Sequence, residues 1–250
     1  MEERYSRNRI YVHPKEQKLI KHFRILLAGA GIGSIIAECA LRFGFESITI
    51  VDGDIVEESN LNRQNYRMED IGKSKAEALK KHLLSINPTA NITSINTFID
   101  TDNMEELING HDIAINALDF KSDIPLVFDE WCQKYNIPVI HPYNIGWGGL
   151  VIVVKPTGMQ LKDFIDGWEN FELKLVEHIV NYCKFWEQPK PWIENIIIQY
   201  ENEKSILPAP QLSIASWIVA GLCTNIIFNI ATGQKVKYYP KFHLSSIIDS

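Results

Sequence analysis

The stretch from Asp52 to Tyr66, DGDIVEESNLNRQNY, gathers acids, amides and one arginine in quick succession. Carboxylates at its start can accept hydrogen bonds from hydroxyl groups, and an arginine beside amides can donate to phosphate oxygens. A solvated loop can be equally polar. The composition of this stretch therefore leaves a binding site and a surface loop as alternatives, and the neighbouring residues must decide between them.

A glycine-rich turn precedes this stretch, since LLAGAGIGS places Gly29, Gly31 and Gly33 between an expected strand and an expected helix. Glycines there let the backbone approach phosphate oxygens at the positive end of the helix. Ser34 takes the last position of the G-x-G-x-x-G pattern, where a small residue is tolerated. Asp52 follows at about the ~20-residue spacing of a ribose-binding acid. The turn and the acid together predict a nucleotide site, and NAD fits them as well as ATP.

The elements that must position these residues follow from the hydrophobic pattern. Apolar runs of strand length alternate with helical patterns through the first 145 residues. This alternation predicts an α/β fold: a Rossmann-like, parallel-dominated sheet with helices on both faces. The expected strands are 23–29, 47–52, 91–99, 111–118 and 137–144, and the expected helices are 34–44, 73–87 and 124–135.

The chain divides into four expected parts. These are an N-terminal helical arm (1–22), a nucleotide-binding α/β core (23–155), a helical and aromatic-rich insert (156–209), and a C-terminal helix and strand that complete the core (210–250). The insert, helical from about 161 to 205, can pack as a cap on the core or bind a partner or a peptide tail. We favour the cap, because aromatic side chains at helical spacing usually pack inside a protein.

Bulk composition excludes several classes of protein. The net charge of −6 over 250 residues argues against a nucleic-acid binder, which needs a basic face. The apolar segment 214–230 is interrupted by polar residues and is shorter than the ~20 residues that a bilayer requires, so we expect a buried helix and no membrane contact. Since no Lys/Arg-led apolar run is visible at the start of the chain, we expect no secretory signal. The four cysteines are widely spaced, which argues against a structural zinc and against disulfides. We expect a cytoplasmic protein.

The order of several motifs is more specific than any of them alone. RYSRN (4–8), the glycine turn, IVDGDIVEESNLNRQ (50–64), IGKSKAEAL (71–79), INP (86–88) and INALD (115–119) follow one another along the chain. This series resembles the ThiF/MoeB/HesA family, the adenylating fold shared with ubiquitin-activating enzymes, over roughly residues 4–150. The resemblance implies ATP-dependent adenylation of a carboxylate with release of pyrophosphate. The carboxylate would be the C-terminus of a ubiquitin-like or sulfur-carrier protein, or of a peptide.

The resemblance also implies roles for individual residues. Asp52 would hold the ribose hydroxyls with Asp54 beside it, and Asp119 would carry magnesium, a hard cation that prefers oxygen ligands. The other implied contacts are Gly29, Gly31, Gly33, Asn60, Arg63, Gln64 and Lys75 with the phosphates, and Arg7 with the site of a neighbouring subunit. A two-fold homodimer is therefore the expected assembly. A terminal carboxylate has a pKa of ~3.3–3.7 and needs no general base, so alignment and charge stabilisation would carry the reaction.

Each assignment has a simpler alternative. Arg63 can pair with Glu57, Glu58 or Asp70 on the surface. Lys75 can be one of several lysines on a solvated helix face. Asp119 can cap the following helix, although Ser122 and Asp123 compete for that place. Arg7 lies in the kind of short basic N-terminus that is common in proteins.

The chain also departs from the family pattern. The two C-x-x-C pairs that hold zinc in many members are missing, and Phe120 and Lys121 follow Asp119 where an Asn and a later Arg are usual. Lys121 can supply the missing charge. Cys183 is the cysteine of the insert, but a helix there places it on an apolar face with Val176, Ile179 and Trp186. A packed cysteine is therefore expected rather than a thioester-forming one.

Three functions remain open from the sequence. The first is adenylation of a carboxylate, in which GWGG (146–149) either threads a Gly-Gly tail or makes a tight bend between two strands. The second is an NAD-dependent oxidoreductase, which leaves Lys75 and Asp119 without a task. The third is a catalytically decayed scaffold of the same fold, which has no need of Arg63, Lys75, Asp52 and Asp119 together. We favour the first.

Overall fold

The computed structural model describes residues 2–163, 167–203 and 207–248 of the chain. Its centre is a seven-stranded sheet in the order β3-β2-β1-β4-β5-β6-β7. The strands are β1 (Arg24–Ala28), β2 (Ser47–Val51), β3 (Asn91–Ile95), β4 (Ile113–Asn116), β5 (Val139–Asn144), β6 (Gly148–Val154) and β7 (Phe242–Ser246). The first five run parallel, and β6 and β7 pair antiparallel at one edge. The parallel-dominated α/β fold predicted from the sequence is confirmed.

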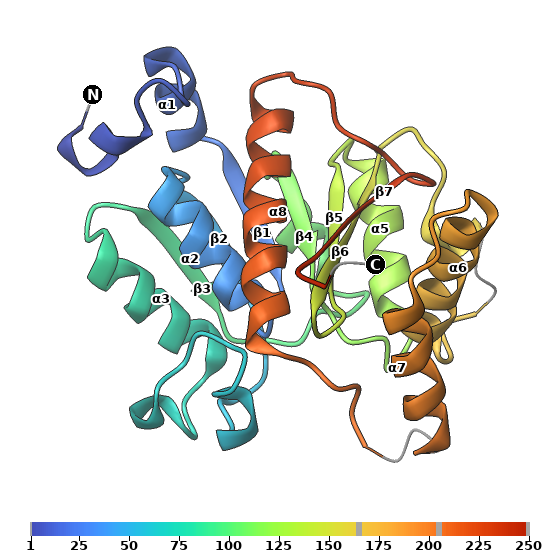
Figure 1. The fold of residues 1–250 in the computed structure, drawn as a ribbon. Coiled ribbons are helices and arrows are strands. Elements are labelled where there is room, and N and C mark those ends of the chain that lie inside the picture. Colours follow the sequence, from blue (N-terminus) through green and yellow to red (C-terminus); the bar gives the residue numbers. More distant parts are fainter. Residues whose placement is uncertain (1, 164–166, 204–206, 249–250) are drawn as a thin grey trace.

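Helices cover both faces of the sheet, as Figure 1 shows. On one face α2 (Gly33–Phe43), α3 (Lys75–Ile86) and α8 (Ser213–Ala231) pack against one set of strand side chains, which includes Ile25 and Leu27. On the other face α4 (Met104–Ile108), α5 (Ile124–Lys134) and α6 (Phe171–Phe185) pack against Leu26 and Ala28. Successive side chains of β1 thus enter two different cores, which explains its unbroken apolar sequence.

Helix α8 is long and apolar enough to cross a membrane by length and composition alone. Half of its most apolar window is buried inside the protein. Val219, Ala220 and Cys223 are fully buried in the core that α8 shares with α2. Helix α8 is therefore a core helix of the α/β domain, as the polar interruptions in its sequence indicated.

The GWGG segment lies in the turn between β5 and β6 and at the start of β6. Gly146 has a φ of +75°, and the Ile145 amide donates to the Gly148 carbonyl at 3.1 Å. A Cβ on Gly149 would lie 2.6 Å from Val219 Cγ2, so a larger residue would push α8 away from the sheet. The tight bend that the sequence suggested is confirmed.

The N-terminal arm lies at the amino ends of the strands. It consists of a 3₁₀ helix, η1 (Glu3–Asn8), and α1 (Pro14–Lys21). The Tyr5 hydroxyl donates to Glu46 Oε1 at 2.8 Å just before β2, and the Asn8 amide donates to the Phe43 carbonyl at the end of α2. Figure 1 shows α1 and the N-terminus beyond this edge of the sheet. The arm is thus fixed at the edge opposite the carboxyl ends of the parallel strands.

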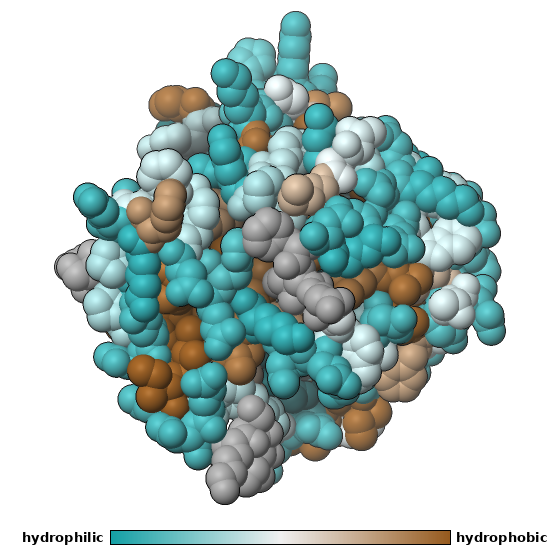
Figure 2. Space-filling view, turned by 90° about the vertical axis from the view of Figure 1, so that its right-hand side faces the viewer, coloured by the Kyte–Doolittle hydropathy of each residue, from teal (hydrophilic) through white to brown (hydrophobic). Residues whose placement is uncertain are grey.

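The 156–209 segment contains η4 (Leu161–Asp163), α6 and α7 (Pro191–Asn202). The helical stretch expected over 161–205 includes 164–166 and 204–205, which lie outside the described residues. The Phe171 ring, fully buried, stacks on Phe120 at 4.3 Å between centroids and so fastens α6 to the loop after β4. Figure 2 shows this side of the molecule, where separate apolar patches lie within a largely hydrophilic surface.

The expected apolar face of α6 is partly wrong. Ile179 and Cys183 are buried, but Trp186 follows the end of the helix and is 57% exposed. The helix ends at Phe185, so the residue beyond it leaves the helical periodicity and turns outward. Burial raises the pKa of the Cys183 thiol, and it does the same for Cys39, Cys132 and Cys223. None of the four cysteines has the lowered pKa of a nucleophilic thiol.

Candidate nucleotide-binding site

The glycine turn after β1 lies where the strand order of the sheet reverses. Gly29 has a φ of +93°, and a Cβ there would lie 2.4 Å from the carbonyl oxygen of Ala117 at the end of β4. A Cβ on Gly33 would lie 2.6 Å from Leu27 Cδ1. Both glycines are needed for close packing of β1, β4 and α2. Ligands of open α/β sheets bind beside this reversal point, at the carboxyl ends of the strands.

Ser34, which replaces the third glycine of the fingerprint, ties the turn to the polar stretch. Its hydroxyl is fully buried, donates to the Gly31 carbonyl at 2.7 Å and accepts from the Asn65 amide at 2.9 Å. The hydroxyl therefore connects the phosphate-type turn to the loop that carries Arg63 and Gln64.

Asp52 locks the turn from the other side. Its Oδ2 accepts from the Ala30 amide at 2.6 Å and its Oδ1 accepts from the Asp54 amide at 2.7 Å. Burial raises the pKa of Asp52, and the two backbone hydrogen bonds oppose that rise. Each carboxylate oxygen keeps a lone pair for a further donor. A contact with ribose hydroxyls stays a prediction.

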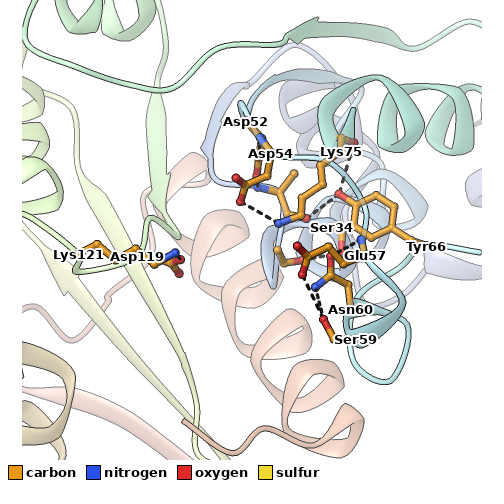
Figure 3. A network of polar contacts seen from close by, with 12 residues as sticks. Ser34, Asp52, Asp54, Glu57, Ser59, Asn60, Tyr66, Lys75, Asp119 and Lys121 are labelled. Atoms are coloured by element: carbon orange, nitrogen blue, oxygen red, sulfur yellow. Dashed lines mark hydrogen bonds and ion pairs between the residues drawn. The ribbon is translucent and has the colours of Figure 1, made fainter. Parts of the chain in front are cut away.

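Lys75 begins α3 and forms an ion pair with Asp54, with its Nζ 3.0 Å from Oδ2 (Figure 3). The lysine is only 9% exposed, whereas the side chain of Asp54 is half exposed. The alternative that Lys75 belongs to a solvated helix face is therefore wrong. Tyr66 holds this lysine near the glycine turn, because its hydroxyl donates to the Ala30 carbonyl and lies 3.4 Å from the Lys75 carbonyl.

Asn60 is the last residue of the short helix η2 (Glu58–Asn60), and Arg63 and Gln64 lie in the loop that follows it. Asn60 is buried, and its Oδ1 accepts from the Glu57 amide at 3.0 Å, so it stabilises the loop. Gln64 Oε1 is buried and has no hydrogen-bond partner among the described residues. Gln64 faces the turn, because a Cβ on Gly31 would lie 3.4 Å from its Nε2.

The Arg63 guanidinium joins this loop to the segment before α8. Its Nε donates to Gln211 Oε1 at 2.6 Å, and its Nη1 donates to the Ser59 carbonyl at 2.8 Å. Within the described residues, its Nη2 makes no hydrogen bond, and Arg63 forms no ion pair with Glu57, Glu58 or Asp70. The alternative that Arg63 forms a surface ion pair with one of these acids is therefore wrong. Burial lowers the pKa of Arg63, and the charge of Asp119 opposes this shift.

Sequence reasoning missed the residues that hold the loop carrying Arg63 and Gln64 against α2 and α3. Glu38 of α2 accepts from Asn65, from His82 Nε2 at 2.7 Å and from Arg42 Nε at 2.6 Å. These bonds, with His82 first, lower the pKa of Glu38 to about 2. The carboxylate therefore links α2, α3 and the residue directly after Gln64. A glutamate within the apolar run Ile35–Leu41 of α2 is the signal of this role in the sequence.

Asp119 lies on the loop after β4, apart from the Lys75–Asp54 pair (Figure 3). Its Oδ2 lies 2.9 Å from Lys121 Nζ, and both side chains are largely exposed. Asp119 does not cap α5, because Asp123 holds the N-cap position and Ser122 Oγ accepts from the Ile124 amide. The pKa of Lys121 is raised first by Asp119 and more weakly by Asp54 and Glu57. Lys121 is therefore influenced by acids of two separate segments, Asp119 after β4 and Asp54 and Glu57 after β2.

A single exposed carboxylate can hold Mg²⁺ only with help from other oxygen ligands. The described part of the chain contains no cluster of three or more His, Cys, Asp or Glu side chains able to hold a metal. Mg²⁺ commonly binds through one or two carboxylates, with waters and substrate phosphates supplying the other oxygens. Asp119 fits that donor set, and its charge helps to raise the pKa of Glu172.

A cavity of about 690 Å³ opens at this edge of the sheet. Gly31, Arg63 and Gln64 line one part, and residues of α6, α7 and the segment before α8 line the rest. Asn116 at the end of β4 also reaches the wall. It donates to Asp129 Oδ1 at 2.9 Å, and His141 Nε2 lies 2.8 Å from Asp129 Oδ2, in a fully buried network that stiffens β4, β5 and α5.

Arg7 lies apart from all of these residues. It is exposed in η1, at the amino ends of the strands, and so does not reach the site of its own chain. Its predicted role in a neighbouring subunit stays a prediction.

The fold and this edge of the sheet together define a Rossmann-like α/β protein with a glycine turn at the reversal of its strand order. The chain belongs to the ThiF family, whose model matches residues 5–249. It is 35% identical over 159 residues to the sulfur carrier protein ThiS adenylyltransferase of Bacillus subtilis, covering 61% of this chain and 47% of that protein. It is 30% identical to the tRNA threonylcarbamoyladenosine dehydratase of Escherichia coli, covering 60% and 54%. The chain spans about half the length of the curated relatives it matches.

Solved structures extend the likeness over the whole chain. E. coli MccB, in a crystal structure with AMPCPP and MccA, aligns with a TM-score of 0.70 at 19% identity, covering 100% of this chain and 72% of that one. PaaA aligns with a TM-score of 0.67 at 23% identity, covering 94% and 73%. At these identities the likeness establishes the fold.

Proposed function

We propose that this chain is an ATP- and Mg²⁺-dependent adenylyltransferase that activates the terminal carboxylate of a ubiquitin-like or sulfur-carrier protein, or of a peptide. The observation that carries the proposal is a glycine turn that Asp52 holds in place, with Lys75 beside the turn and with Arg63 and Asp119 among the residues that line the adjoining cavity. Adenylyltransferases that act on such carrier proteins are among the relatives, and one structural neighbour was crystallised with ATP.

The residues divide the task between them. Asp52 and Ser34 fix the turn, so that the Gly31 region can face phosphate oxygens at the start of α2. Lys75 and the Nη2 group of Arg63 supply N–H donors for the triphosphate, and Lys121 offers a further cation. Asp119 would hold Mg²⁺, which neutralises phosphate charge when it is bound. The substrate carboxylate, already ionised, attacks the α-phosphorus, and pyrophosphate leaves with the electron pair of the broken P–O bond.

The competing functions have less support. An NAD-dependent oxidoreductase would use the turn and Asp52 but neither Lys75 nor Asp119. A decayed scaffold would have no reason to keep Lys75 buried against Asp54. A tRNA acceptor, as the dehydratase relatives suggest by name, fits poorly with a net charge of −6. The homodimer, with Arg7 entering the partner's site, and a cytoplasmic location remain parts of this proposal.

Pyrophosphate exchange into ATP tests the proposal. Purified protein is incubated with Mg²⁺, labelled pyrophosphate and candidate carrier proteins or peptides with free C-termini. Asp119→Ala is expected to lower the exchange rate ~100-fold or more, since it removes a preorganised charge at the phosphates. Asp123→Ala is the matched control, because this exposed acid makes no side-chain cap bond to α5. Full exchange by Asp119→Ala would sink the proposal.

A further inference from the structure

One part of the cavity wall has a chemistry of its own. Tyr143 of β5, Glu172 and Val176 of α6, and Ile196 and Ile197 of α7 line it, and we name these five residues the acceptor chamber. Its walls combine aliphatic side chains with one hydroxyl and one carboxylate. Triphosphate oxygens need cations and N–H donors, which this chamber lacks among its five residues. The chamber is therefore suited to a different part of the bound substrates.

Tyr143 is a buried polar group with no hydrogen-bond partner among the described residues. Its side chain is 8% exposed, and its hydroxyl makes no hydrogen bond to any described residue. Burial raises the pKa of Tyr143, and the nearby charge of Glu172 raises it further. Unpaired buried hydroxyls are costly and uncommon in folded proteins. This one faces a cavity, so a ligand group that accepts a hydrogen bond can satisfy it.

Glu172 is a carboxylate that lines the cavity with an exposed side chain. Within the described residues it makes no hydrogen bond or ion pair. Desolvation by the protein around it raises the pKa of Glu172, and the charge of Asp119 adds to this rise. Among the cavity-lining side chains of the described residues, Asp119, Glu172 and Glu203 are acidic and Arg63 is basic. Because Lys121 or a metal can neutralise Asp119, and Glu203 is not among the five residues of the acceptor chamber, Glu172 is the acid of this chamber that can attract a cation from the occupant.

We propose that the acceptor chamber binds an extended peptide segment with a lysine or arginine close to its C-terminal carboxylate, the cation pairing with Glu172 while aliphatic side chains cover the flanking residue. The Tyr143 hydroxyl donates to a backbone carbonyl of this segment. The terminal carboxylate then lies toward Gly31 and Arg63, at the other part of the same cavity. This inference rests on the proposed adenylation and names the class of its acceptor.

A peptide scan separates this inference from the adenylation itself. The probes are acetylated hexapeptides of Ala and Leu with a free C-terminus. Lysine, norleucine or glutamate occupies each of the four positions before the last residue in turn. Binding is measured by calorimetry in the presence of Mg²⁺ and AMPCPP, and turnover by pyrophosphate exchange. Wild-type protein is expected to favour lysine over norleucine at least tenfold at one position and to disfavour glutamate there.

Variants identify the group responsible. Glu172→Gln is expected to remove the lysine preference, and Glu172→Lys to reverse it toward glutamate. Glu177→Gln, on the same helix but outside the cavity lining, should keep the wild-type preference. Tyr143→Phe should weaken all peptides several-fold and leave the charge preference unchanged. Equal treatment of lysine and norleucine by wild-type protein, or an equal loss for all peptides in Glu172→Gln, would overturn the inference.

ATP binding is measured in parallel. If the protein binds ATP and exchanges pyrophosphate with norleucine peptides as well as with lysine peptides, adenylation stands and the chamber assignment fails. If ATP does not bind, the proposed function fails, and peptide binding without nucleotide still decides whether the chamber prefers a cation.

Discussion

Replacing Lys75 by methionine separates the catalytic task of this lysine from its part in the fold. Methionine keeps an unbranched side chain of similar length, so the packing around this nearly buried position is retained while the charge is removed. The lost ion pair joins Lys75 to a half-exposed Asp54. Such pairs contribute about 1 kcal/mol or less, because water screens the exposed partner. The free energy of unfolding should therefore fall by no more than about 1 kcal/mol.

The effect on activity should be far larger. A preorganised donor beside developing phosphate charge contributes about 2.7–4 kcal/mol, or roughly 10²–10³ in kcat. Pyrophosphate exchange by Lys75→Met is therefore expected to fall at least ~100-fold at saturating ATP, and ATP affinity should fall too. Urea denaturation followed by circular dichroism gives the stability of the same preparation.

Lys73→Met is the matched control. Lys73 lies two residues earlier, is exposed, and has its Nζ 3.7 Å from Asp70 Oδ1, so it carries a comparable ion pair on the surface. It should change neither stability nor exchange by more than about twofold. Exchange near the wild-type rate in Lys75→Met, with stability unchanged, would refute the assignment of this lysine to the triphosphate.

Three further predictions test the supporting structure. Gly29→Ala should lower the free energy of unfolding by about 2 kcal/mol or more, because strain at a positive φ adds to a clash with the Ala117 carbonyl. Gly72→Ala is also at a positive φ but in open space, so it should lower this free energy by about 1 kcal/mol. Urea denaturation compares the two variants. The pKa of Glu38 is about 2, below its ordinary 4.5, so the stability it provides is present above pH 4.5 and lost as the pH falls toward 2. Glu38→Gln should therefore have a lower free energy of unfolding than wild type at pH 6, and this free energy should fall less than that of wild type on acidification to pH 3. An equal fall in both proteins would contradict this. Cys183→Ser should retain pyrophosphate exchange within a fewfold, since burial raises the pKa of that thiol; abolished exchange in a folded variant would restore a catalytic cysteine.

Local patterns made the frame of the site predictable. Strands buried on both faces read as apolar runs, so β1 and β4 were expected close to where they lie. A glycine turn needs glycines for reasons that are visible in the sequence, and Gly29 meets Ala117 as that turn requires. Asp52 was expected beside the turn because it ends the neighbouring strand. These inferences need only short-range sequence and the connectivity of parallel sheets.

Pairings between distant residues were not predictable. Lys75 meets Asp54 across 21 positions, and Glu38 meets His82 across 44, so no local pattern marks them. Trp186 was misplaced because the helix boundary was not marked in the sequence. The cavity wall formed by α6 and α7 depends on how the 156–209 segment folds back over the strand ends, which its composition does not specify. The division of the chain into four parts stays a prediction.

The central claim is that this edge of the sheet binds a triphosphate, and calorimetric titration of the purified protein with ATP, in the presence of Mg²⁺, tests it most directly. The account predicts that ATP binds, that AMP binds more weakly, that NADH does not bind, and that Lys75→Met weakens the affinity for ATP more than that for AMP. Tight binding of NADH without binding of ATP would contradict it, because Lys75, Arg63 and Asp119 would then have no phosphate chain to hold.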